Sequence, residues 1–273
     1  MNTKENTMHV LENIIKEKID QVSGLREGMQ QYNHHYDEKI LRKQRGGGDH
    51  DNAMNNYNGY SMEEMNLKLL ECTYDAAAAF RKKRHETTAI SDKMTAFMAS
   101  IGNYISEYRD SASILDVGCG TGILLNYIPS RLLRQYKGLD LSLEMVKVAR
   151  ESFPEHEFIH SDYLKYYDSV TSGSRGFDVI VFNECFHYFV NHQKIIDKSI
   201  NLLNRRGSII ISHPTGFTNV FSQHNKNHLM VPNLLPTIEK IKGYLSSHND
   251  VDVRVSPDIK GQHYLCVLQR NGA

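Results

Sequence analysis

Three glycines at alternate positions have the spacing of a turn that binds a nucleotide-type ligand. In ILDVGCGTG, Gly118, Gly120 and Gly122 follow a short apolar run that contains Asp116, and a helix-forming stretch begins at Ile123. Glycine adopts positive φ without a steric penalty and lets a ligand approach the backbone, while the N-terminal amides of a helix favour negative groups. The pattern is GxGxG and not the GxGxxG of dinucleotide enzymes, so binding of a pyrophosphate is the weaker interpretation.

Carboxylates come at the ends of two further apolar runs. Asp140 closes YKGLD, where it can accept hydrogen bonds from both hydroxyls of a ribose, and Asp162 follows FIHS, where it can accept one from an adenine amino group. Each feature has a simpler explanation, because glycines form turns without ligands and a single Asp after a strand usually caps a helix. The combination in register with three strands predicts an adenosine-containing ligand.

Two histidines are candidates for catalysis or substrate contact. His187 lies in NECFHYF, together with Glu184, and His213 lies in SHPTG. These segments follow the fourth and fifth expected strands, and open α/β folds bind ligands at the carboxyl ends of their strands. Imidazole can serve as a base where an alcohol or phenol must lose a proton. Packing beside the ligand is an alternative role for His187.

The segments that position these residues alternate between short apolar runs and helical stretches from residue 113 onward. This pattern predicts βαβ units and a doubly wound, mostly parallel, seven-stranded α/β sheet. Ser142 is expected to cap the helix that follows the second strand. The expected strands are 113–117, 136–139, 157–160, 178–183, 208–212, 251–256 and 263–269.

The residues before the sheet divide into three parts by composition. Residues 1–44 form a helical appendage, in which 8–23 have the apolar spacing of an amphipathic helix. Residues 45–60 are rich in Gly and Asn and predict a flexible loop, and 61–112 predict a helical lid. The ligand-binding domain is then expected over 113–273, with the long connection 217–236 as a possible substrate loop.

The charge balance and the cysteines limit the environment and partners. Lys plus Arg and Asp plus Glu both total 32 in 273 residues, so no net basic charge favours nucleic acid or anionic lipid. The apolar runs are strand-sized, which predicts a soluble chain with no membrane partner. The four cysteines are scattered and residues 1–20 lack the apolar stretch of a secretory signal, so a cytoplasmic location is expected.

A metal site is not expected from the 14 histidines. His224 and His228 have a helical i, i+4 spacing, but their segment QHNKNH is Asn-rich and contains no carboxylate ligand. The basic run RKKRH, which begins at Arg81, reads as a solvated helix face, with contact to a carboxylate substrate as the alternative.

As an ordered set, ILDVGCGTG, GLDLSLEMVKVAR, HSD, FDVIVFNECFHYF and LLNRRGSIIIS resemble the class I S-adenosylmethionine-dependent methyltransferases over about residues 94–270. The resemblance implies a Rossmann-like methyltransferase fold with a reversed last strand and S-adenosyl-L-methionine as methyl donor. It also implies that Asp116, Gly118 and Gly120 hold the methionine end, Asp140 the ribose, and Asp162 with Tyr163 the adenine. The remaining cofactor candidates are Cys119, Gly122, Leu141 and Asn183. The sequence departs from many relatives at NRRG, 204–207, where they have a Pro-Gly-Gly turn.

These observations predict a methyltransferase that acts on a small polar metabolite by in-line displacement, with sulfur or oxygen acceptors favoured and nitrogen possible. The segment after the fourth strand lacks the Asn-Pro-Pro-aromatic signature of amino-directed nucleic-acid methyltransferases, which weighs with the zero net charge against a nucleic-acid partner. A catalytically silent scaffold subunit, a nucleic-acid methyltransferase and a nicotinamide dehydrogenase are the alternatives. The sequence leaves the oligomeric state open.

Overall fold

The computed structural model describes residues 3–44, 56–87, 92–108, 110–170 and 176–272. The chain divides into two compact units, Met1–Ala77 and Ala78–Ala273. Most of the predicted Gly/Asn-rich loop, residues 45–55, lies outside the described residues.

The first unit is built from helices and one small hairpin. Its helices are α1 (Thr3–Gln21), α2 (Leu25–Gln44) and the first part of α3 (Met62–Thr87), and its hairpin pairs β1 (Asn56–Tyr57) with β2 (Tyr60–Ser61). The predicted helix over 8–23 is thus present. The predicted loop ends instead in this hairpin, because Asn58 and Gly59 both adopt the positive φ that a tight two-residue turn requires.

The second unit contains a seven-stranded sheet of order β5-β4-β3-β6-β7-β9-β8. All pairs among the first five strands of that order are parallel, and β9 is antiparallel to both of its neighbours. The predicted doubly wound sheet with a reversed last strand is therefore confirmed. The strands are β3 (Ala112–Val117), β4 (Leu133–Asp140), β5 (Glu157–His160), β6 (Phe177–Asn183), β7 (Leu203–His213), β8 (Val251–Val255) and β9 (Tyr264–Arg270).

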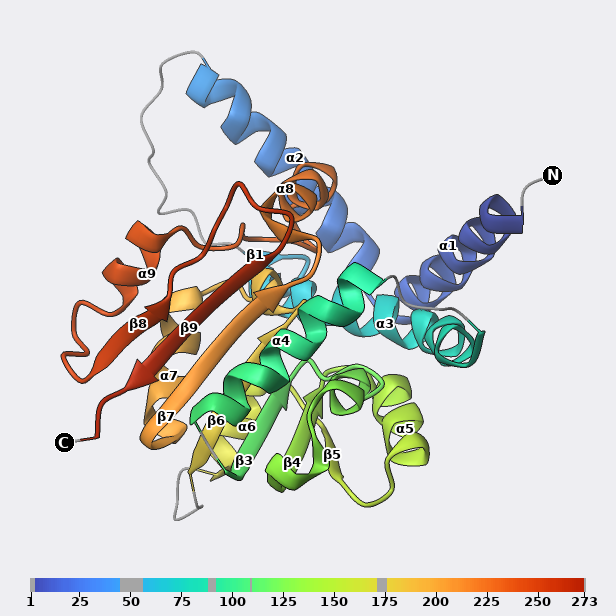
Figure 1. The fold of residues 1–273 in the computed structure, drawn as a ribbon. Coiled ribbons are helices and arrows are strands. Elements are labelled where there is room, and N and C mark those ends of the chain that lie inside the picture. The colour runs from blue at the N-terminus through green and yellow to red at the C-terminus, as the bar shows by residue number, and fades with distance from the viewer. Residues whose placement is uncertain (1–2, 45–55, 88–91, 109, 171–175, 273) are drawn as a thin grey trace. The chain divides into compact units, whose positions relative to one another are not determined.

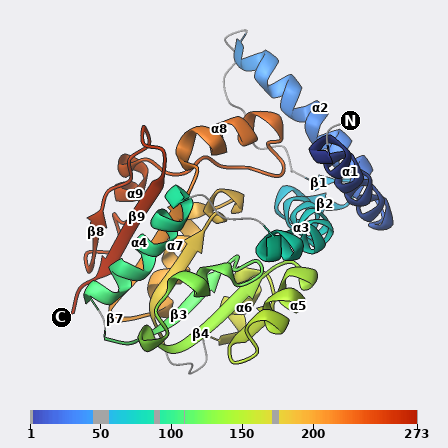
Figure 2. The same cartoon turned by 45° about the vertical axis from the view of Figure 1, so that its right-hand side comes forward.

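Helices cover both faces of this sheet (Figures 1 and 2). One apolar core joins alternate strand residues to α4 (Asp92–Tyr108) and α5 (Leu143–Ser152). The other core joins the intervening residues to α6 (Tyr163–Val170), α7 (His192–Leu202) and α9 (Ile238–Tyr244). Because α4 is buried against the sheet, it belongs to the helical layer on that face. The part of the expected lid, residues 61–112, that forms α4 is therefore a structural helix of the fold.

The segment after the glycine turn differs from the α-helix expected to begin at Ile123. It forms two short 3-10 turns, η1 (Ile123–Tyr127) and η2 (Ser130–Leu132), on either side of Pro129. Gly102 of α4 allows this segment to pack closely, because a Cβ at that position would lie 2.3 Å from the carbonyl oxygen of Tyr127. Within the described residues, no helix is long and apolar enough to cross a bilayer.

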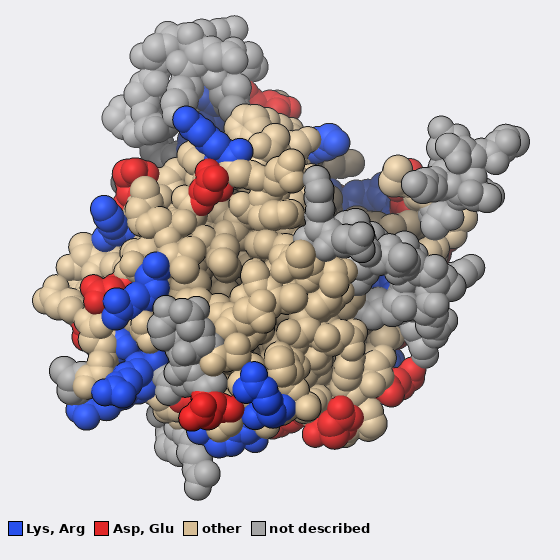
Figure 3. Space-filling model, viewed as in Figure 1, with Lys and Arg blue, Asp and Glu red and all other residues tan. Residues whose placement is uncertain are grey.

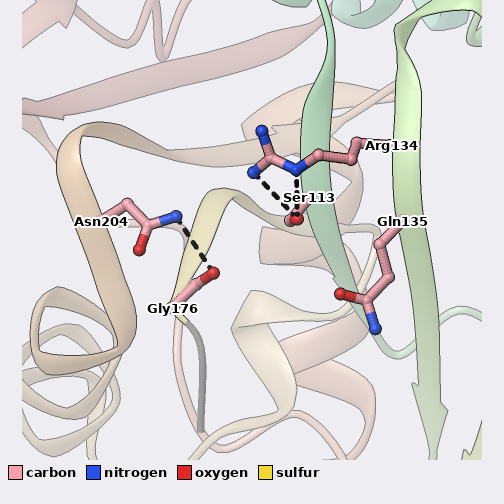
Figure 4. A pocket seen from close by; sticks show the side chains of 5 residues that line it. All are labelled: Ser113, Arg134, Gln135, Gly176 and Asn204. Atoms are coloured by element: carbon pink, nitrogen blue, oxygen red, sulfur yellow. Dashed lines mark hydrogen bonds between the residues drawn. The ribbon is translucent and has the colours of Figure 1, made fainter.

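At the amino ends of the strands, Asp178 joins four neighbouring strands. Its carboxylate accepts hydrogen bonds from the Ser113 amide at 2.9 Å and the Asn204 side chain at 3.1 Å, and it forms an ion pair with Arg134. Asn204 also donates to the carbonyl of Gly176, and both residues line a cavity of about 440 Å³ (Figure 4). Asn204 is the first residue of NRRG, so this departure from the usual turn serves to hold strand ends together.

Candidate active site

The carboxyl ends of β3, β4, β6 and β7 form one edge at which most of the predicted site residues lie. The chain passes from β3 to β4 on one side, while β6 pairs with the other side of β3, so the strand order reverses between β3 and β6. Such a switch point is where open α/β sheets bind ligands. The register places Val117 opposite both Leu139 and Phe182, which brings Gly118, Asp140 and Asn183 to the same edge.

The three glycines of the turn all have positive φ, but their surroundings differ. A Cβ on Gly118 would lie 2.7 Å from the Cβ of Cys185, and one on Gly122 would lie 3.0 Å from the ring of Phe153. A Cβ on Gly120 would meet no described heavy atom within 4 Å. Gly118 and Gly122 are therefore required by packing, whereas Gly120 borders open space beside the turn, as a ligand-binding glycine does.

Asp140 fastens the glycine turn to the start of α5. One carboxylate oxygen accepts a hydrogen bond from the Gly120 amide and the other from the Ser142 amide, each at 2.8 Å. Ser142 in turn caps α5 by accepting from the Met145 amide, as its sequence position predicts. Each carboxylate oxygen has two lone pairs, so these backbone bonds leave Asp140 able to accept ribose hydroxyls as well.

Asp116 lies below the turn and is 2% exposed. The hydroxyl of Tyr136 donates to its carboxylate at 2.5 Å. Burial raises the pKa of Asp116 to about 7; the Tyr136 bond opposes this shift, and the nearby Asp140 carboxylate adds to it. The charge of Asp116 therefore changes close to neutral pH, and a cationic ligand group would favour its ionised form. The residue types alone did not reveal Tyr136, although the β3–β4 register could have suggested it.

Asp162 and Tyr163, which the family resemblance assigns to the adenine, both make contacts within the protein. Asp162 caps α6 by accepting a hydrogen bond from the Lys165 amide at 3.0 Å, which is the simpler of its two expected roles. Tyr163 is 2% exposed, its hydroxyl bonds to Ser199 at 2.7 Å, and its ring packs edge-on against Phe182. The Tyr163 side chain therefore belongs to the core, and only its main chain remains a candidate for contact with adenine.

The other cofactor candidates support the loops at this edge. Cys119 is buried, and burial raises the pKa of its thiol, so the thiol stays neutral. The carbonyl of Leu141 bonds to the His160 ring at 2.9 Å, and the Asn183 side chain accepts from the Ser212 hydroxyl at 2.8 Å.

His187 and His213 lie together, as their positions after neighbouring strands predict. Their ring centroids are 5.1 Å apart and the rings meet edge to face. Burial lowers the pKa of His213 to about 4 and that of His187 well below its usual range, so both rings are neutral at neutral pH. Glu184 is exposed directly after β6 with a φ of 58°, and its amide donates to the Ser212 carbonyl at 2.9 Å.

The connection after β7 covers the His187 segment. It contains α8 (Gly216–Lys226) and then a stretch with buried Leu229 and Val231. The amide of Asn233 donates to the His187 carbonyl at 3.4 Å, and its side chain donates to the Phe189 carbonyl at 2.8 Å. These contacts hold the connection against the backbone on either side of Tyr188.

The described residues contain no group of three or more His, Cys, Asp and Glu side chains arranged to hold a metal ion. The rings of His224 and His228 are 4.7 Å apart, and Nδ1 of His224 is hydrogen-bonded to the Val231 carbonyl at 2.7 Å. This bond gives His224 a structural role at the end of α8.

The doubly wound sheet, the glycine turn at its switch point and the carboxylate that ends the next strand define a nucleoside-binding α/β protein. The chain belongs to the family described as methyltransferase domain, which matches residues 90–244. The resemblance to class I methyltransferases is thereby confirmed.

Named relatives fall in several substrate groups. The chain is 28% identical over 106 residues to a trans-aconitate 2-methyltransferase of Rhodopseudomonas palustris, covering 38% of this chain and 40% of the relative. It is 30% identical over 140 residues to a ribosomal protein L11 methyltransferase of Staphylococcus saprophyticus, covering 50% and 40%. The chain thus spans about two fifths of the length of these relatives.

Solved structures share the fold. The plantazolicin methyltransferase BpumL, in complex with a triazolic desmethylPZN analog and SAH, superposes with a TM-score of 0.53 at 18% identity, over 75% of this chain and 98% of that one.

Proposed function

We propose that this protein is an S-adenosylmethionine-dependent methyltransferase. The observation that carries the proposal is the glycine turn at the switch point, where Gly120 borders open space and is bonded through its amide to Asp140. When bound, the cofactor would supply a methyl group on a positively charged sulfur; a nucleophile can bond to that methyl carbon in line, with the neutral thioether as the leaving group.

The residues at the switch point fit each end of that cofactor. Asp116 supplies a buried carboxylate whose ionised form a methionine ammonium would stabilise. Asp140 supplies acceptors for the ribose, and Gly118 with Gly120 supplies backbone that a ligand can approach. Positioning dominates catalysis of such a transfer, because holding two reactants in line replaces an entropically costly encounter.

For the acceptor, we propose a small polar metabolite with an oxygen or sulfur nucleophile, nitrogen being possible. The protein's net charge is zero, and acidic and basic side chains of the described residues intermix on the face in Figure 3. A single-sign surface of the kind that holds a nucleic-acid backbone is thus not visible among the described residues there. The name of the trans-aconitate relative points the same way.

A protein substrate is the second candidate, and the ribosomal protein L11 methyltransferases among the relatives favour it. The scaffold and nucleic-acid alternatives have less support. A scaffold that binds no cofactor has no need to keep Asp116, Gly120 and Asp140 together. Because all three meet at the switch point here, the scaffold alternative is disfavoured.

Calorimetry with S-adenosylhomocysteine, the product form of the cofactor, tests the cofactor assignment. We expect binding by the full chain and a loss of about tenfold to a hundredfold in Asp140→Ala, because hydrogen bonds to a charged acceptor contribute roughly 1.5–3 kcal/mol. Asp252→Ala, at an exposed position of the edge strand β8, is the matched control and should bind like the wild type. A folded protein that does not bind the nucleoside would refute the proposal.

Transfer of a labelled methyl group then separates the substrate classes. Incubation with the small-molecule, protein and RNA fractions of a cell extract should place the label in the small-molecule fraction. Label found only in protein would establish the second candidate, and label found only in RNA would establish the nucleic-acid alternative.

A further inference from the structure

The hydrogen bonds around His213 define which of its ring nitrogens carries the proton. The amide of Thr215 donates to Nδ1 at 3.4 Å, and the Thr215 hydroxyl lies 3.2 Å from the same atom. The side-chain amide of Asn219 donates to that hydroxyl oxygen at 2.6 Å. The hydroxyl hydrogen of Thr215 therefore points away from Asn219 and is available to Nδ1 of His213. A backbone amide can only donate, so Nδ1 is unprotonated and a neutral His213 carries its proton on Nε2.

This tautomer makes His213 a hydrogen-bond donor. Its one lone-pair nitrogen is already occupied by Thr215 at the start of α8, so the ring has no free site to accept a proton from a substrate. Burial keeps the ring neutral, since it lowers the pKa of His213 to about 4. His213 therefore presents an N–H and is not arranged as a general base.

His187 offers a second donor beside it. The residue is 1% exposed, and among the described residues neither of its ring nitrogens has a hydrogen-bond partner. Burying a polar group without a hydrogen-bond partner is costly, so a ligand that supplies the partner recovers that free energy. The ring lies between Tyr188, at 4.0 Å, and His213, at 5.1 Å. This desolvated position opposes formation of an imidazolium, so His187 is also a poor acceptor of a substrate proton.

Building on the proposed methyltransferase function, we infer that the methyl acceptor is a carboxylate oxygen, held by the ring N–H groups of His213 and His187. A carboxylate has two oxygens with which to accept the two N–H bonds. A hydroxyl acceptor would need a base, which neither ring is arranged to be. A thiolate accepts hydrogen bonds more weakly than a carboxylate and would use the two donors poorly.

The reaction balances without proton transfer. An oxygen lone pair of the carboxylate forms the new C–O bond as the C–S bond breaks, and the electron pair of that bond remains on sulfur. The sulfonium becomes a neutral thioether, and the carboxylate becomes a methyl ester. The two imidazole rings orient the acceptor and keep their protons throughout.

The chemical stability of the product tests this inference directly. A panel of aliphatic and aromatic carboxylic acids, each beside its amide and alcohol analogue, is incubated with the full chain and a methyl-labelled donor. Methyl esters release methanol in mild alkali, so the label should become volatile, and only the acids should be labelled. Label that resists alkali, as in an ether, thioether or N-methyl product, would overturn the inference and leave the methyltransferase proposal standing. Binding of S-adenosylhomocysteine without labelling of any acid would overturn it as well.

Paired substitutions at position 213 separate a donor from a base. The side-chain amide of Gln can place an N–H near the position of Nε2 but cannot take up a proton. His213→Gln should therefore keep kcat/KM within about tenfold of the wild type, which is the change that the loss of one neutral hydrogen bond produces. His213→Leu should lose more than tenfold and, by calorimetry with S-adenosylhomocysteine present, should bind the best acid of the panel more weakly. His248→Gln, at a position bonded to Asp197 away from the edge, is the control. Equal loss in the Gln and Leu variants would show that His213 is not acting as a donor.

Discussion

At the scale of single residues, burial decides the charge state of the groups at the candidate site. Asp116 is held at a pKa of about 7, whereas His187 and His213 are held neutral. All three shifts have desolvation as their largest cause. A site that keeps its imidazoles neutral and its carboxylate near half-ionised is suited to binding a cationic cosubstrate beside an uncharged pair of donors.

The raised pKa of Asp116 predicts that S-adenosylhomocysteine binding depends on pH. Below about pH 7 the free protein holds a proton on Asp116, and binding an ammonium beside it requires that proton to leave. Affinity should therefore rise with pH and level off above pH 7. It should be about tenfold weaker at pH 6 than at pH 8, because the ionised fraction of a group with a pKa of about 7 changes by about tenfold between these values.

Calorimetry across that range provides the measurement, and two variants sharpen it. Asp116→Asn should bind weakly and without this pH dependence. Tyr136→Phe removes a bond that favours the carboxylate and should move the midpoint to higher pH. Affinity that stays constant between pH 6 and pH 8 in the wild type would contradict the assignment of Asp116 to the ammonium.

At the scale of elements, the glycine turn shows how one motif serves packing and binding together. Gly118 faces Cys185 across the β3–β6 switch, while Gly120 faces open space, although the two glycines have similar positive φ. Sequence spacing identified the turn but could not separate these roles, because the neighbour of Gly118 comes from a segment far along the chain.

Alanine substitutions should separate the two roles. Gly118→Ala should destabilise the fold by about 2–5 kcal/mol, combining left-handed backbone strain with overpacking. Gly120→Ala should cost only about 1–2 kcal/mol, the backbone strain alone, yet reduce S-adenosylhomocysteine affinity more than tenfold. Gly243→Ala, in α9 with open space around it, is the control and should stabilise by about 0.5–1 kcal/mol. Chemical denaturation and calorimetry measure both effects, and equal stability losses at positions 118 and 120 would refute the distinction.

At the scale of the whole molecule, three buried histidines predict sensitivity to acid. Burial lowers the pKa of His192 and of His213 to about 4, and that of His187 falls well below its usual range. Below about pH 6.5 the unfolded chain takes up protons at these positions while the folded protein does not, so the free energy of unfolding falls as pH drops toward 4. Asp116 acts with the opposite sign, because its folded-state pKa is raised, so its contribution grows as pH falls below 7.

The three histidines outweigh the single carboxyl. His192 and His213 should each cost about 2 kcal/mol of stability at pH 5, His187 adds to the loss in the same direction, and Asp116 should offset about one histidine. Denaturation at pH 7 and pH 5 should therefore show a net loss of a few kcal/mol. His213→Gln removes one titrating group and should reduce that loss by about 2 kcal/mol. A wild-type protein as stable at pH 5 as at pH 7 would contradict the burial of these rings.

Much of the fold could be predicted because its signals are local. Strand-length apolar runs, the glycine turn and the Ser142 cap each depend on residues within a few positions of one another, and all three are found where expected. The errors arose where distant segments meet. The side chain of Tyr163, a residue named for contact with adenine, lies in the core against α7, and the hairpin at Asn58 replaces the end of a predicted loop.

By itself, the sequence determined the order of strands and helices and which residue types reach the carboxyl edge of the sheet, since period and turn chemistry are read along the chain. Only the tertiary structure decided which of those residues face one another. The hydrogen bond from Tyr136 to Asp116 and the burial of His187 without a hydrogen-bond partner depend on packing between separate elements, whereas the contact of Thr215 with His213 is local and depends on the backbone conformation after β7. Such packing sets desolvation and hydrogen-bond direction, and these in turn set the charge and the tautomer with which each group can act.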